Sequence, residues 1–212
     1  MEAVIENGFA RVESGEWLAS PSQPVAYSGT VQAKGLRGFI VPDRAALRFV
    51  ASSGGMLCAA AERPFLTRLD ALPTDGDAPS APLCVVSGKI LLAPFASRKG
   101  ARLMRPVPMT VRPSYPVTEF SGGWVVAATR SRVLRFAVGE GETFAVRTDA
   151  LVAWSGNAPT GFCPKVGFLD MLLPRAPRNL QFHFHGPCVV WLEGTAENAV
   201  RRVFPRGGAM YA

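Results

Sequence analysis

Short apolar runs alternate with turn residues along almost the whole chain of 212 residues. Most runs are short, place apolar side chains at every second position or continuously, and end near Gly, Pro, Asn or Asp, which is the pattern of β-strands. We expect strands at 16–19, 25–32, 38–41, 47–51, 57–60, 83–86, 89–93, 102–105, 123–129, 132–137, 144–147, 151–154, 180–185 and 188–192. The pattern predicts an all-β fold.

Helical periodicity is weak throughout the sequence. Apolar residues spaced three and four apart occur weakly at 167–173 and at 195–203, where Thr195 is a plausible N-cap. We therefore expect at most one or two short helices.

Two stretches carry the sequence signal of a β-hairpin. In "FAVGEGETFAVRT" two alternating runs flank the turn residues 139–142, and in "WVVAATRSRVLRFAV" they flank 129–131. Both stretches predict neighbouring antiparallel strands.

A short phrase occurs twice, as "FIVPDRAAL" from Phe39 and "FAVRTDAL" from Phe144. Each copy predicts a strand, a turn whose Asp side chain ties the turn backbone, and a second strand. We prefer this turn role for Asp149 to a carboxylate pair with Asp43. The repetition predicts a single antiparallel β-sandwich domain over 1–212, built from two similar halves, roughly 1–110 and 111–212.

The composition predicts a large core and a covered surface. Hydrophobic residues make up 48% of the chain and charged residues only 18%. The chain is therefore less charged than an average soluble domain. Part of the apolar surface is therefore expected to face other copies, in a homo-oligomer that is a trimer or larger.

The cysteines and the N-terminus predict a cytoplasmic protein. The four Cys form no CxxC pair, and three of them lie in apolar runs, where a reduced thiol packs as a small hydrophobe. The sequence starts with early acids and without a basic, then apolar, leader. No run approaches the length of a membrane span.

Three stretches resemble, in order, the signatures of the altered-inheritance-of-mitochondria family: "GKILLAPFASRKGARLMR", "RVLRFAVGEGETFAVRTDALVAWSGN" and "LQFHFHGPCVVWLEG". "GPC" stands where a second glycine is usual, and Trp154-Ser155 replaces a more acidic turn. The resemblance implies a compact β-sandwich similar to that of the tryptophan RNA-binding attenuation protein, a homo-oligomer, and no catalytic residues to carry over. Matching positions are Leu92, Pro94, Gly141, Val146, Leu151, Val152, Ala153, Gly186, Pro187, Val190, Trp191 and Leu192.

His183 and His185 are the strongest candidates for metal chemistry. Residues i and i+2 of a strand point to the same side, so both rings could meet one metal, with Glu193 as a distant third ligand. This arrangement suggests a cupin-like metal-dependent enzyme as one alternative. The sequence has no third histidine, so we prefer imidazoles that pack or face solvent, and expect no metal or other cofactor.

Nucleophilic chemistry has weaker signals. There is no nucleophile elbow, and Cys163 beside Lys165 is interpreted as a thiol lining a turn rather than an activated one. We therefore expect no catalytic residue.

A basic stretch suggests a second alternative function. The net charge is +7, and no acid occurs between Asp77 and Glu119. Clustered cations could bind RNA phosphates or another anionic partner, although only Phe95 and Tyr115 are available for base stacking. The candidate residues are Lys89, Arg98, Lys99, Arg102, Arg105 and Arg112. The preferred function is a non-enzymatic oligomeric scaffold or interaction protein.

Overall fold

The structure is a computed structural model that describes residues 3–19, 24–34, 47–60, 63, 65–71, 81–104, 115–162 and 181–194. Its strands are β1 (Val4–Glu6), β2 (Phe9–Val12), β3 (Gly15–Ala19), β4 (Pro24–Ser28), β5 (Val31–Lys34), β6 (Leu47–Ala51), β7 (Met56–Ala60), β8 (Phe65–Asp70), β9 (Leu83–Val86), β10 (Ile90–Pro94), β11 (Arg98–Met104), β12 (Tyr115–Phe120), β13 (Trp124–Thr129), β14 (Val133–Val138), β15 (Thr143–Arg147), β16 (Leu151–Gly156), β17 (Thr160–Phe162), β18 (Gln181–His185) and β19 (Cys188–Glu193). Two single 3₁₀ turns, η1 (Ser87–Lys89) and η2 (Phe95–Ser97), complete the described elements. The predicted all-β class is confirmed. The two helix candidates lie outside the described residues.

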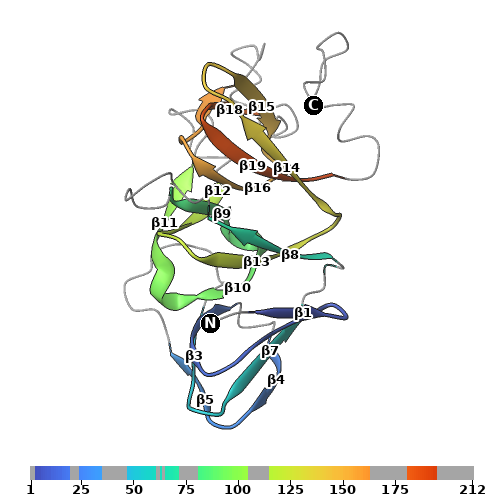
Figure 1. The fold of residues 1–212 in the computed structure, drawn as a ribbon, viewed down its shortest axis with the longest axis vertical. Helices are drawn as coiled ribbons and strands as arrows, with labels where there is room; N and C mark the ends of the chain where they lie inside the picture. Colours follow the sequence, from blue (N-terminus) through green and yellow to red (C-terminus); the bar gives the residue numbers. More distant parts are fainter. Residues whose placement is uncertain are drawn as a thin grey trace, which may run out of the picture.

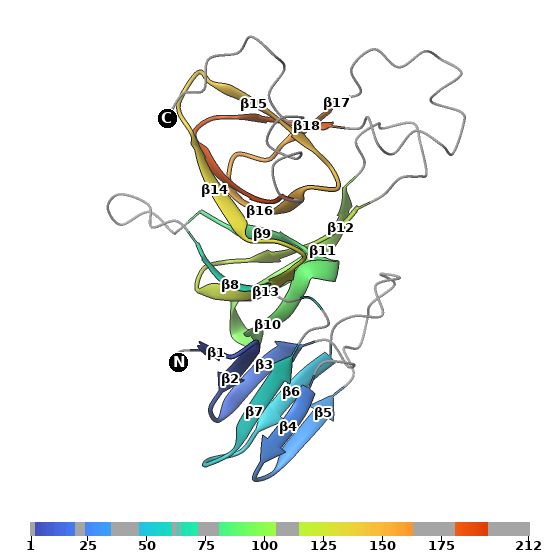
Figure 2. The same ribbon diagram turned by 90° about the vertical axis from the view of Figure 1, so that its right-hand side faces the viewer.

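Four antiparallel sheets are stacked in layers (Figures 1 and 2). Sheet A has the strand order β1-β2-β7-β4, and sheet B has the order β5-β6-β3-β10-β13-β8. Sheet C has the order β11-β12-β9-β16-β19-β14, and the small sheet D has the order β15-β18-β17. None of the helical segments described is long and apolar enough to cross a membrane.

Three cores fill the spaces between successive sheets. Trp17 and Trp124, whose ring centroids are 5.8 Å apart, lie in the core between sheets A and B. The next residue along β3, Leu18, lies in the core between sheets B and C. Because neighbouring residues of a strand point to opposite faces, sheet B is buried on both sides. This explains why its central strands, β10 and β13, are nearly continuous apolar runs.

The strand order repeats three times along the chain. The strands β3, β5, β6 and β8 lie in sheet B, while β4 and β7 lie in sheet A. In the same way β9, β11, β12 and β14 lie in sheet C, with β10 and β13 inserted into sheet B. Then β15, β17 and β18 lie in sheet D, with β16 and β19 inserted into sheet C. The repeats therefore interlock, and they follow different boundaries from the predicted halves 1–110 and 111–212.

Both predicted hairpins are wrong, because each stretch crosses from one layer to the next. The strand β13 pairs with β8 and β10 in sheet B, whereas β14 pairs with β19 in sheet C. The following strand, β15, pairs with β18 in sheet D. A polar turn between two alternating runs fits a corner between sheets as well as it fits a hairpin.

The second copy of the repeated phrase forms a strand, a turn and a strand, β15 and β16, as predicted. The turn is closed by a backbone hydrogen bond from Ala150 N–H to the carbonyl of Arg147. Asp149 accepts hydrogen bonds from the Arg147 guanidinium, so it fixes that side chain and not the turn backbone as expected. The turn of the first copy, near Asp43, lies outside the described residues.

Candidate functional site

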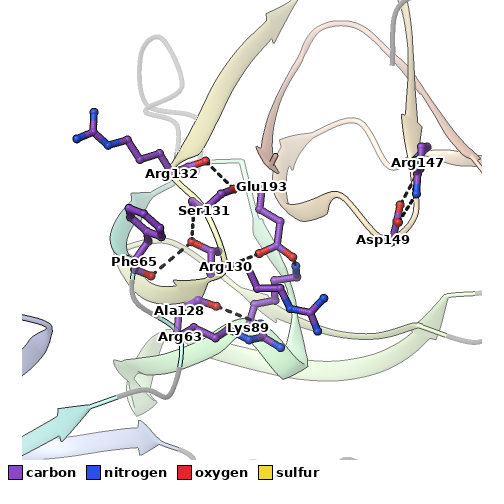
Figure 3. A network of polar contacts seen from close by, with 11 residues as sticks. Arg63, Phe65, Lys89, Ala128, Arg130, Ser131, Arg132, Arg147, Asp149 and Glu193 are labelled. Atoms are coloured by element: carbon purple, nitrogen blue, oxygen red, sulfur yellow. Dashed lines mark hydrogen bonds and ion pairs between the residues drawn. The ribbon is translucent and has the colours of Figure 1, made fainter. Parts of the chain in front are cut away.

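A buried ion pair joins Lys89 in η1 to Glu193 at the end of β19 (Figure 3). Their side chains are only 10% and 11% exposed. The second carboxylate oxygen of Glu193 accepts a hydrogen bond from the backbone N–H of Arg130, 3.0 Å away. The carboxylate is therefore held by two donors from different parts of the chain.

The location of this pair follows from the interlocked repeats. The turn η1 carries the chain from β9 in sheet C to β10 in sheet B, and residues 130–132 carry it back from β13 to β14. Glu193 ends the strand that lies beside β14. Burial lowers the pKa of Lys89, Glu193 opposes this by hydrogen bond and charge, and the nearby Arg63 and Arg130 lower it further.

Arg63 and Arg130 lie near the ion pair, and further arginines follow at the start of β14. Arg63 donates a hydrogen bond to the carbonyl of Ala128, 3.2 Å away. Within the described part of the chain, the guanidinium groups of Arg130, Arg132 and Arg135 form no ion pair. Several other described basic residues are paired, as in Arg48–Glu16, Arg68–Asp70, Lys99–Glu119 and Arg147–Asp149. The turn before β14 and the start of that strand therefore form an uncompensated positive surface, which we call the β14 arginine surface.

The predicted basic stretch is divided between the interior and one sheet edge. Lys89 is buried against Glu193 and does not share a surface with the others. Arg98, whose pKa is lowered by partial burial, Lys99 and Arg102 lie on β11, at the opposite edge of sheet C from β14. Arg105 and Arg112 lie outside the described residues.

The structure does not bring His183, His185 and Glu193 together. The two histidines lie on β18 and point away from the core that Phe182 and Phe184 fill. Cys188 begins β19, shortly after the histidine strand, and Glu193 ends it. At about 3.3 Å per residue, the length of β19 from Cys188 to Glu193 is about 17 Å. The described segments hold no cluster of three potential metal ligands. Burial, together with the neighbouring His185, lowers the pKa of His183, while the ring of His185 is hydrogen-bonded to Thr143, 3.1 Å away.

The thiols differ in their surroundings. Cys84 and Cys188 are buried in the core between sheets C and D, and burial raises the pKa of the Cys188 thiol. Cys58 is half-buried on β7. Cys163 lies outside the described residues.

The outer face of sheet A carries exposed apolar side chains and is not covered by another described layer. The inner residues of β2 and β7, such as Ala10 and Leu57, are fully buried in the first core. The outer face carries Val4, which is 39% exposed, and Phe9, which is 44% exposed. The remaining outer residues of β1, β2 and β7, as given by the strand register, are Glu6, Arg11, Met56, Cys58 and Ala60.

Sequence reasoning missed the strands that build this face, β1 and β2. A signal for them exists in the dipeptide Asn7-Gly8, the commonest two-residue hairpin turn. Both residues have positive φ, 50° and 81°, as that turn requires. The turn joins β1 to β2 in direct antiparallel pairing.

The protein belongs to the all-β class and is built from stacked antiparallel β-sheets. No family model matches the chain, and no match was found among curated proteins. Protein SPYM3_0169 from Streptococcus pyogenes is similar in structure, with a TM-score of 0.65 over 92% of each chain at 14% identity. At this identity the likeness shows a shared fold.

Proposed function

We propose that the protein is a non-enzymatic β-sheet scaffold that associates with a second copy of itself through the outer face of sheet A. The uncovered face of that sheet, with the exposed apolar side chains of Val4 and Phe9, is the observation that carries the proposal. Every inner sheet of the stack has both faces covered by neighbours, and exposed apolar patches of this kind are typical of interaction sites.

The charges on this face favour pairing of identical copies. Glu6 and Arg11 lie on the same face of the β1–β2 hairpin, beside Phe9 and Val4. In a two-fold interface, if one residue of a copy contacts a second residue of its partner, the second residue of that copy also contacts the first residue of the partner. Arg11 of one copy can then pair with Glu6 of the other, while the apolar side chains meet between them.

The size of the face sets the expected strength of association. Four strands spaced about 4.8 Å apart, with about 3.3 Å per residue, present a flat area of roughly 300 Å². Stable complexes bury about 800 Å² per partner. We therefore expect a weak dimer, with a dissociation constant of about 10 to 100 µM. The predicted trimer or larger assembly would need a second contact.

The placement of reactive groups supports a non-enzymatic role. Lys89 and Glu193 neutralise each other in the interior. The two histidines are separated from Glu193, which weakens the cupin-like alternative.

Membership of the altered-inheritance-of-mitochondria family is part of this proposal. The order of the motifs and the all-β fold support it.

Sedimentation equilibrium tests the proposal with two matched variants. The wild type should shift from monomer to dimer as its concentration rises through about 100 µM. Phe9→Asp should remain monomeric, because it places a charge in the proposed contact. Leu134→Asp, at a residue of similar exposure on β14, should dimerise like the wild type. A wild type that stays monomeric, or equal behaviour of both variants, would reject the proposal.

A further inference from the structure

We propose that β14 binds an extended acidic peptide of a partner protein, which adds to sheet C as a further strand. This inference concerns a different surface from the outer face of sheet A, and it does not depend on self-association.

The backbone of β14 provides the first part of the argument. All six residues pair with β19, from Val133 opposite Glu193 to Val138 opposite Cys188. The strand ends the order of sheet C, so its other edge pairs with no described strand, and it runs along the border of the stack in both views (Figures 1 and 2). Such an edge presents N–H and C=O groups that an extended peptide can bind.

The side chains of β14 define the sequence that would fit. Phe136 and Val138 pack in the core between sheets C and D, so Leu134 lies on that same face, and it is 41% exposed. Arg135 is exposed on the opposite face. Side chains of an added strand would lie beside these residues on each face. An alternation of apolar and acidic residues therefore fits this edge.

The charge of the β14 arginine surface favours an acidic occupant. Arg130, Arg132 and Arg135 have no acidic partner within the described residues. The carboxylate of Glu193, which accepts the backbone N–H of Arg130, is already paired with Lys89. The chain's own segment 195–212 is a poor occupant, because it adds Arg201, Arg202 and Arg206 and only one acid.

A peptide fits this surface better than a nucleic acid does. Binding of single strands relies on aromatic side chains on which bases stack. The aromatic residue of β14, Phe136, is half-buried and packs against Phe144 with ring centroids 5.2 Å apart. The surface instead offers a free backbone edge and an exposed leucine, which a nucleic acid does not use.

Fluorescence anisotropy with a labelled peptide of alternating Glu and Val tests the inference. The wild type should bind it, and the variant with Arg130, Arg132 and Arg135 all changed to Glu should bind about tenfold more weakly. Lys99→Glu, on the opposite edge of sheet C, should bind like the wild type. Circular dichroism should show that both variants are folded.

Peptide methylation separates strand addition from simple charge attraction. Methyl groups on alternate backbone nitrogens block only one edge of an extended peptide, so one methylated set should abolish binding while the other preserves it. Equal binding of both sets would overturn the inference. So would tighter binding of a single-stranded RNA probe that is lost in the triple variant, because the surface would then recognise phosphate.

Discussion

Lys89 and Glu193 form a buried ion pair, although 104 residues separate them in the sequence. Removing one partner leaves an uncompensated buried charge, so we expect Lys89→Met or Glu193→Gln to lower the free energy of unfolding by about 3 to 5 kcal/mol. The double variant Lys89→Met, Glu193→Leu should be more stable than either single variant. Urea denaturation measures all three.

The matched control for this pair is Lys99→Met. Lys99 is 54% exposed and lies 3.9 Å from Glu119, so its loss should cost at most about 1 kcal/mol. Equal costs at Lys89 and Lys99 would contradict the structural role of the buried pair.

Gly186 lies against the backbone of Gly139 at the corner between β18 and β19. A Cβ atom at position 186 would be 1.7 Å from the Gly139 carbonyl oxygen, and backbone atoms cannot yield as a flexible side chain can. We therefore expect Gly186→Ala to lower the free energy of unfolding by at least about 2 kcal/mol. At Gly88 a Cβ would meet nothing within 4 Å, so Gly88→Ala should leave the denaturation midpoint nearly unchanged.

His183 should make the protein less stable in mild acid. Its pKa in the folded state is lowered from 6.5 by burial and by the neighbouring His185. At pH values between the lowered pKa of the folded state and 6.5, the unfolded chain binds more protons than the folded chain. The free energy of unfolding therefore falls as pH drops below 6.5. The loss ends once the folded-state pKa is passed. Denaturation midpoints measured between pH 8 and pH 5 should fall less steeply for His183→Gln, and an unchanged slope would exclude this residue as the cause.

The sequence predicts the strands well where their apolar pattern is complete. The continuous apolar run "WVVAAT" predicts a strand that is buried on both faces. It forms β13, in which all six residues are buried between the two cores that flank sheet B. The missed strand β12 begins with Tyr115-Pro116 in a proline-rich stretch, which is unusual for an inner strand. The pairing with β9 begins only at Val117, so Pro116 has a partner on β11 alone. Pattern reasoning places a loop there because the sequence does not show where that pairing starts.

Pairing and site geometry could not be predicted in the same way. The turn at 129–131 predicts local pairing, but β14 pairs with β19, whose residues lie fifty or more positions later in the chain. The Lys89–Glu193 pair arises from the same long-range crossing, so neither residue carries a local signal of its partner. His183 and His185 lie on one face of β18, and that placement follows from strand geometry alone.

Cys58 lies on the outer face of sheet A, opposite Arg11 in the strand register, and so reports directly on the proposed dimer. The decisive measurement is the rate at which N-ethylmaleimide modifies Cys58, followed by mass spectrometry of its peptide at increasing protein concentration. The rate should fall as dimers form in the wild type and stay constant in Phe9→Asp. A wild-type rate that is independent of concentration up to about 200 µM would contradict association through this face.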